Sequence, residues 1–199
     1  SQSQRVFMDT VRFKLSGRLQ YLRVSETDKD EVFHTVLRPT SAEHFAALGA
    51  YNGDTIRELL SYTHGTYASI TALEPDRRSF RKLSAWSEQN LSGTVRLVQA
   101  GAWCEDTMLR FSDQAGRQSR VAAKGRETQM RALDSVLDGR PCTFLKMDVE
   151  GAEREAIAGA EQTIRQHRPK LNIAAYHRSE DFFQLTPPHH PPFPDSPPY

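Results

Sequence analysis

The predicted fold rests first on one segment near the middle of the second half of the chain, Thr143-Phe144-Leu145-Lys146-Met147-Asp148-Val149-Glu150-Gly151-Ala152-Glu153. It begins as a short, mostly apolar run of the kind that forms a buried strand. It then brings two carboxylates, a glycine and a third carboxylate, and continues into the helix-forming residues 154–160. In an open α/β sheet, ligands bind at the carboxyl ends of the strands. A strand that ends in Asp-Val-Glu-Gly is therefore expected to direct acidic groups toward a ligand.

The composition is that of one domain with a sizeable core. The chain has 199 residues and a formal net charge of +1, so there is no broad electrostatic reason to expect nucleic acid or an anionic membrane as a partner. No apolar run approaches the length that spans a bilayer. Cys104 and Cys142 are isolated, which fits a reducing compartment and two small core residues. We expect a cytoplasmic protein, and the sequence does not fix its oligomeric state.

The two ends of the chain differ from its middle. Residues 1–40 are expected to form an N-terminal extension in which 10–15 and 19–24 alternate polar and apolar side chains, and this predicts a β-hairpin. Seven of the thirteen residues at 187–199 are proline, so this segment is expected to be an extended or disordered tail. The core domain is therefore expected at 41–186.

Strands and helices alternate through the core domain. Strands are expected at 44–48, 67–73, 95–100, 143–147 and 171–177, and helices at 56–60, 77–90 and 151–167. Asp54 or Thr55 can cap the first helix, and Asp76 the second. Segments 107–111 and 119–123 are expected to form an antiparallel pair. The alternation is typical of an α/β fold with a doubly wound, mostly parallel sheet.

Candidate site residues lie where these strands end. Gly49 and Gly53 allow a tight turn and a close backbone approach to a ligand. Glu74 follows the next strand, 21 residues after Gly53, where a carboxylate can accept from both hydroxyls of a ribose. Asp148 follows the strand of the opening stretch, and a carboxylate there is costly unless it meets a partner. His177 ends the last strand, and histidine is the side chain that most often serves as a general base.

These residues also have structural interpretations. The glycine loop can be an ordinary turn, Glu74 a solvated acid, and His177 a hydrogen-bond partner of a neighbouring loop. Glu150 and Glu153 can stabilise the first turn of a helix through its dipole. Asp148 and His177 alone are too few ligands to predict a metal site, so no metal is expected.

Four motifs, taken in order, resemble the FkbM family of S-adenosylmethionine-dependent methyltransferases. They are Gly49-Ala50-Tyr51-Asn52-Gly53-Asp54-Thr55, Ala72-Leu73-Glu74-Pro75-Asp76, Lys146-Met147-Asp148-Val149-Glu150-Gly151-Ala152-Glu153 and Ala175-Tyr176-His177. The resemblance covers roughly residues 44–185. It implies a class I methyltransferase (Rossmann-like) fold, S-adenosylmethionine as the cofactor, and O-methylation of a hydroxyl on a small molecule, sugar or polyketide.

The resemblance also implies roles for the site residues. The residues that would surround the methionine part of the cofactor are Gly49, Tyr51, Asn52 and Gly53. Glu74 would hold the ribose, and Asp148 would lie near the methionine or the transferred methyl. Asp148 and His177 are the catalytic candidates, with His177 as the base that takes the proton of the acceptor hydroxyl.

Two features depart from the family pattern and leave alternatives open. Ala47 stands where the family usually has an acid, and a proline-rich segment follows Leu185 where the family continues into further strands. One alternative is a degenerate, non-catalytic methyltransferase-like module that binds weakly or serves an interaction. A nicotinamide-dependent oxidoreductase shares the glycine-to-acid spacing, but the sequence lacks the G-x-G-x-x-G triplet.

Overall fold

The structure, a computed structural model, describes residues 2–111 and 126–177. The chain divides into two compact units, with the division between Arg38 and Pro39. The expected tail at 187–199 and the expected strand at 119–123 lie outside the described residues. Among the helices in the described ranges, none is both long enough and apolar enough to cross a lipid bilayer.

The first unit is helical, so the predicted N-terminal hairpin is wrong. Its elements are α1 (Gln2–Ser16), α2 (Gln20–Ser25), α3 (Lys29–Val32) and the π-helix η1 (Phe33–Leu37). The alternation at 10–15 covers too few residues to distinguish a strand from a helix. Over a longer segment, Val6, Thr10 and Phe13 recur at the spacing of one helix face. Gly17 has a φ of 67° and donates its N–H to the carbonyl of Phe13 at 2.8 Å, which ends a helix rather than turning a hairpin.

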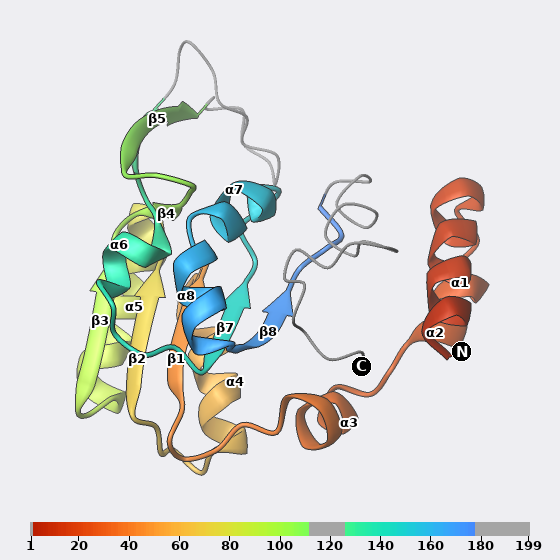
Figure 1. Cartoon of the computed structure of the whole chain (residues 1–199), viewed down its shortest axis with the longest axis horizontal. Coiled ribbons are helices and arrows are strands. Elements are labelled where there is room, and N and C mark those ends of the chain that lie inside the picture. The colour runs from red at the N-terminus through yellow and green to blue at the C-terminus, as the bar shows by residue number, and fades with distance from the viewer. Residues whose placement is uncertain (1, 112–125, 178–199) are drawn as a thin grey trace. The chain divides into compact units, whose positions relative to one another are not determined.

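The second unit is built on a five-stranded, all-parallel sheet (Figure 1). Its strands in spatial order are β3 (Thr94–Val98), β2 (Ser69–Leu73), β1 (His44–Leu48), β7 (Phe144–Met147) and β8 (Lys170–Ile173). The chain winds outward from β1 to β3 and then returns to the other side of β1. This confirms the predicted doubly wound fold and places its switch point between β1 and β7.

Helices cover both faces of this sheet. The connections are α4 (Asp54–Tyr62) from β1 to β2, α5 (Arg77–Asn90) from β2 to β3, and α7 (Glu153–Ala158) with α8 (Glu161–His167) from β7 to β8. Right-handed crossovers that run in opposite directions along a parallel sheet lie on opposite faces. Figure 1 shows α7 and α8 in front of the sheet together with α6 (Leu133–Leu137). The core on that side packs Leu48, Leu145 and Met147 of the strands against Val136 and Ile164 of the helices.

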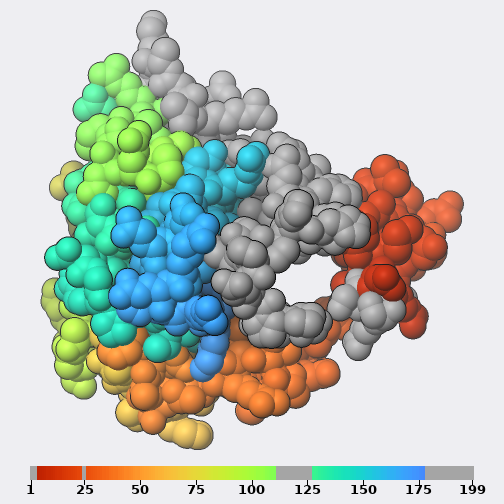
Figure 2. All heavy atoms as spheres, viewed as in Figure 1, coloured from red at the N-terminus to blue at the C-terminus, as the bar shows by residue number. Residues whose placement is uncertain are grey.

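The predicted single helix at 151–167 is two helices. A Cβ on Gly159 would lie 1.9 Å from the carbonyl oxygen of Trp103, so only glycine fits where α7 ends. The carboxylate of Asp134 in α6 accepts from the N–H groups of Gln162 (2.9 Å) and Thr163 (2.8 Å), and so caps α8 from outside. Figure 2 shows these segments, teal for α6 and blue for α8, side by side on the viewed face.

A small second sheet follows β3 in the chain. It contains β4 (Gly101–Ala102), β6 (Arg126–Arg131) and β5 (Thr107–Phe111), in that spatial order. The expected strand at 107–111 is therefore present, and its antiparallel partner is β6.

Glu43 joins the amino ends of three neighbouring strands. It is 1% exposed, precedes β1, and accepts hydrogen bonds from the hydroxyl of Thr143 before β7 and the ammonium of Lys170 in β8. The N–H of Thr40 also donates to it, at 2.9 Å. Burial acts to raise the pKa of Glu43, but the hydrogen bonds from these three partners and the charge of Lys170 outweigh burial and lower that pKa. Since ligands of such sheets bind at the opposite ends of the strands, this cluster is a structural clamp.

Candidate functional site

The glycine loop, residues 49–53, follows β1 at the carboxyl edge of the sheet. Three of its residues have a left-handed backbone, with φ of 78° at Gly49, 48° at Tyr51 and 90° at Gly53. The N–H groups of Gly49 and Ala50 both donate to the carbonyl of Leu73 at 3.0 Å, which attaches the loop to the end of β2. The left-handed conformation of a non-glycine residue costs of order 1–3 kcal/mol and concentrates at functional sites, and Tyr51 is such a residue.

Both glycines of the loop are required by packing as well as by φ. A Cβ on Gly49 would lie 1.9 Å from the carbonyl oxygen of Asp148, and a Cβ on Gly53 would lie 2.8 Å from the ring of Trp86. Gly53 is also the N-cap of α4, a position that the sequence assigned to Asp54 or Thr55. The close approach that the sequence assigned to a ligand is thus made, in this structure, to the protein itself.

Glu74 lies directly after β2 and fastens two turns to each other. Its Oε2 accepts from the N–H of Tyr51 at 2.7 Å, and its Oε1 accepts from the N–H of Asp76 at 2.8 Å. The residue is 6% exposed, and burial raises the pKa of its carboxyl despite the two backbone hydrogen bonds. Asp76 caps α5 as expected, accepting from the N–H groups of Arg78 and Ser79.

Asn52 is fixed by the helix that follows the loop. The Nη1 atom of Arg57 in α4 lies 3.2 Å from the carbonyl oxygen of Asn52 and 3.5 Å from its side-chain oxygen. The same guanidinium lies over the ring of Trp86, 4.2 Å from its centre. A cation over an indole face is attractive, so this stack holds α4 and α5 together beside the loop.

The acid–histidine cluster consists of Asp148, Glu153 and His177, beyond the carboxyl ends of β7 and β8. The strand expected at 171–177 ends at Ile173, so His177 lies four residues past it and does not end the strand. The Nε2 atom of His177 lies 3.5 Å from Oδ1 of Asp148, and its Nδ1 atom lies 2.9 Å from Oε1 of Glu153. Oε2 of Glu150 is 3.2 Å from the same Nε2 atom. The parallel sheet was expected to bring Asp148 and His177 to one rim, and the structure places them in contact.

Glu153 has a larger part in the site than its helix position indicated. It is fully buried, and its Oε1 accepts from the N–H groups of Val149 (3.1 Å) and Gly151 (3.3 Å). This closes the loop after β7, in which Glu150 has a φ of 55° and Gly151 a φ of 98°. The sequence contained one signal of this role, a glycine two residues before a carboxylate, but it did not show that the loop would turn back on Glu153.

Lys146 and Tyr176 complete the surroundings of Asp148, and the sequence identified neither as a site residue. The ammonium of Lys146 and the hydroxyl of Tyr176 lie 3.4 Å and 3.3 Å from Oδ2 of Asp148. The ring of Tyr176 also packs on His177, with 4.3 Å between ring centres. Burial, together with the charge of Asp148, raises the pKa of Tyr176, so its hydroxyl keeps its proton and donates to Asp148.

The two halves of the site meet at Gly49. On one side, Glu74 is hydrogen-bonded to the glycine loop; on the other, the N–H of Asp148 donates to the carbonyl of Leu48 at 2.9 Å, next to Gly49. Ala47, which stands where an acid was expected, is fully buried and pairs in register with Lys146 across the β1–β7 ladder.

Comparisons with known proteins agree with this architecture. The sequence model of the methyltransferase FkbM domain matches residues 48–195. The crystal structure of methyltransferase FkbM from Methylobacillus flagellatus KT is similar over 89% of this chain, with a TM-score of 0.74 and 27% sequence identity. The chain covers 45% of that protein, so it spans about half of its length. No protein of curated function matches the chain significantly.

Proposed function

Because the chain belongs to the FkbM methyltransferase family, we propose that it moves a methyl group from S-adenosylmethionine to a hydroxyl oxygen of a small molecule or glycan. The observation that carries the proposal is the hydrogen bond from the N–H of Tyr51 to Oε2 of Glu74. It joins a glycine loop and a strand-end acid at the carboxyl ends of the neighbouring strands β1 and β2. That is where an open α/β sheet binds a nucleoside ligand.

The residues present fit this cofactor. A carboxylate oxygen can accept two hydrogen bonds, so each oxygen of Glu74 keeps a lone pair for a ribose hydroxyl after accepting one N–H. Oδ1 of Asp148 is buried without a hydrogen-bond partner in the described part of the chain, and its charge suits an ammonium or a sulfonium. The glycine loop lies between these two acids and would hold the methionine part.

The chemistry proposed is an in-line displacement at a methyl carbon. S-adenosylmethionine supplies a methyl group activated by its sulfonium sulfur. The protein contributes alignment of the two reactants in a site that excludes water. Nδ1 of His177 is engaged with Glu153, so Nε2 is the nitrogen that would take the proton of the acceptor hydroxyl.

A non-catalytic binding module is the second candidate, and Ala47 is the observation that favours it. In the family an acid at this position would add a negative charge beside the loop. Here a fully buried methyl group takes its place. The fold and the rest of the site would be kept in such a module, with a weaker hold on the cofactor.

Calorimetric titration with S-adenosylmethionine, S-adenosylhomocysteine and NAD separates these functions. We expect saturable binding of the first two and no heat with NAD. If none of the three ligands gives binding heat, in protein shown to be folded by circular dichroism, the result would support the binding module. Saturation by NAD alone would support an oxidoreductase.

A Glu74→Gln variant tests the ribose contact within the same titration. Glutamine keeps one acceptor oxygen but places an NH₂ group against one of the two N–H donors, so we expect affinity for S-adenosylhomocysteine to fall about 10-fold or more. Asp76→Asn is the matched control, because Asp76 caps α5 two residues away. Unchanged affinity in Glu74→Gln would show that the ribose assignment is wrong.

A further inference from the structure

The acid–histidine cluster has carboxylate oxygens without donors. Oε2 of Glu153 and Oδ1 of Asp148 are buried and have no hydrogen-bond partner among the described residues. Glu153 is completely buried, so bulk water does not solvate its free oxygen. A buried acceptor left unpaired costs roughly 1–3 kcal/mol, and more when it is charged. The cluster is therefore expected to bind a positively charged group.

The charge around the cluster points to a cation with more than one positive charge. Three carboxylates, those of Asp148, Glu150 and Glu153, lie within 3.5 Å of the His177 ring. Among the described residues, Lys146 is the lysine or arginine that reaches Asp148, at 3.4 Å, and it approaches Oδ2 and not the unpaired Oδ1. One lysine does not balance three acids, and a proton on His177 would leave Oε2 of Glu153 without a partner.

The spacing of the three side chains suits one metal ion. Asp148, Glu153 and His177 each offer one ligand atom, and these atoms all lie within 4.8 Å of one another. Ligand atoms about 2.0–2.2 Å from a shared octahedral ion lie roughly 3 to 4.4 Å apart, so a small side-chain adjustment brings the set to a binding geometry.

We propose that Asp148, Glu153 and His177 form a binding site for one divalent cation of the Mn²⁺ type. Carboxylates suit Mg²⁺, Ca²⁺ and Mn²⁺, while imidazole suits the transition metals, and Mn²⁺ accepts both kinds of ligand. The sequence identified only Asp148 and His177 as possible ligands, too few for a site. Glu153, brought in by the turn after β7, supplies the third ligand.

A bound cation would change the role of His177. A cation and a proton compete for the same imidazole, so with the ion in place the acceptor hydroxyl would be activated by coordination to the ion and would lose its proton to the exposed carboxylate of Glu150. This consequence rests on the proposed methyl transfer, in which Oδ1 of Asp148 would be shared between the ion and the cofactor. The binding of the ion is independent of it and is measured without a methyl donor.

Electron paramagnetic resonance of Mn²⁺ tests the proposal on the full chain after treatment with a chelator. We expect one Mn²⁺ to bind per chain and the signal of free Mn²⁺ to fall accordingly. Asp148→Asn and Glu153→Gln should each raise the dissociation constant by about 10-fold or more. Glutamine at 153 keeps an acceptor oxygen for the N–H groups of Val149 and Gly151, and circular dichroism checks that each variant folds.

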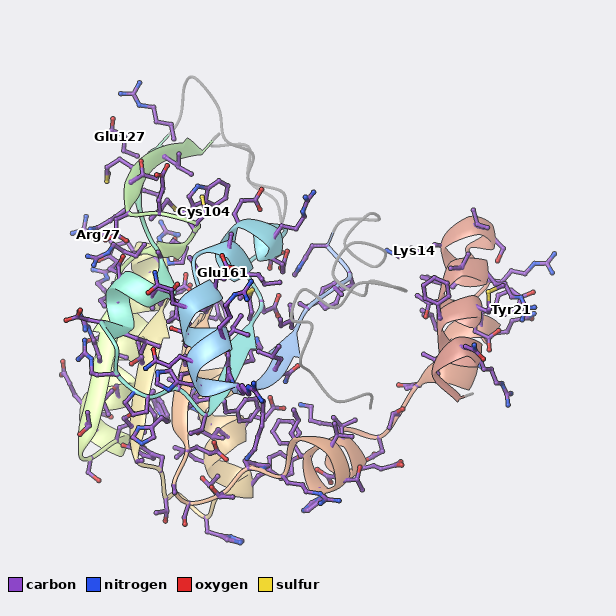
Figure 3. All side chains as sticks on the ribbon, in the orientation of Figure 1. Lys14, Tyr21, Arg77, Cys104, Glu127 and Glu161 are labelled. Atoms are coloured by element: carbon purple, nitrogen blue, oxygen red, sulfur yellow. The ribbon has the colours of Figure 1, made fainter. Side chains whose placement is uncertain are left out.

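Glu127→Gln is the matched control. Glu127 is an exposed, ion-paired glutamate, 2.7 Å from Arg110, and lies on β6 of the second sheet (Figure 3). Its replacement should leave the dissociation constant of Mn²⁺ unchanged. No saturable binding at millimolar Mn²⁺ in the folded parent would overturn the proposal, as would parental affinity in both cluster variants. Mn²⁺ binding without binding of S-adenosylhomocysteine would overturn the methyltransferase proposal alone.

Discussion

Ala47 and Lys146 lie side by side on neighbouring strands of the candidate site. They are register partners in the β1–β7 pair, so their side chains project from the same face of the sheet. Lys146 has no acid opposite it at 47 and instead lies 3.4 Å from Asp148. An acid at 47 would compete for Lys146 and leave Asp148 freer to bind a positively charged ligand.

We expect Ala47→Asp to tighten the binding of S-adenosylhomocysteine by several-fold. The new carboxylate is buried, but Lys146 is close enough to compensate its charge, and a charge-assisted hydrogen bond is worth about 1.5–3 kcal/mol. Calorimetric dissociation constants measure the effect. Ala47→Asn has the same shape without the charge and should not tighten binding. Equal affinities in the two variants would show that a charge at 47 does not act on the ligand.

At the scale of elements, Glu43 keeps the amino ends of β1, β7 and β8 in register. Its folded-state pKa is lowered, so its contribution to stability is fully present above the unfolded pKa of about 4.3 and is lost as the pH falls through the lower folded value. A neutral replacement removes this contribution at neutral pH, where Glu43 is ionised. It removes little in strong acid, where Glu43 is already protonated.

Glu43→Gln should therefore lower the free energy of unfolding near pH 7 by about 1–3 kcal/mol. The difference from the parent should shrink as the pH falls below about 4. Denaturant unfolding of both proteins between pH 3 and 7 measures it. Glu161→Gln is the control, because Glu161 is exposed and, in the part of the chain that the structure describes, its ion pair is with Arg165 of the same helix. If Glu43→Gln lowers the free energy of unfolding by the same amount at every pH, the result would contradict a stabilising role for the ionised carboxylate of Glu43.

Prediction from sequence succeeded for helices and strands whose hydrophobic pattern extends over their whole length. The helix expected at 77–90 has those bounds in the structure, and the strand at 44–48 likewise, because burial on one helix face or throughout a strand dominates there. It failed at 10–24, where a short alternation also fits a helix, and at Gly159, where a long-range contact with Trp103 ends α7. A local window contains no information on such a contact.

The residues of the candidate site also fall into those that the sequence predicted and those that it did not. Asp148 and His177 were expected on one rim because strand ends of a parallel sheet share one edge. Glu153 and Tyr176 were not, since their positions depend on the left-handed turn after β7 and on the path of the chain beyond β8. Lys146 lies within β7, and the sequence did not show that its side chain would reach Asp148. Topology can be deduced from the order of elements, whereas the direction of a side chain in a loop cannot.

At the scale of the whole molecule, the sheet should be most stable in its middle. β1 and β7 are hydrogen-bonded on both sides, whereas β3 and β8 each pair with one strand in the described part of the chain. Local opening free energies range from near zero to the global value, so central strands should exchange their amide hydrogens about 100-fold more slowly than edge strands.

Hydrogen exchange followed by mass spectrometry measures this for each strand. Peptides that cover 44–48 and 144–147 should be protected longest, and those that cover 94–98 and 170–173 should exchange earlier. Protection of 170–173 equal to that of 144–147 would contradict the prediction. It would mean that the side of β8 that faces away from β7 is covered in solution.

The packing of Trp86 on the glycine loop has a practical consequence. The chain has two tryptophans, and Trp86 lies against Gly53 with a guanidinium over its ring. Indole emission responds to a nearby charge and to a change of contact, so the loop contains its own fluorophore. In a Trp103→Phe protein the emission spectrum would report from this single position, and occupancy of the loop could be followed in real time without a label or a turnover assay.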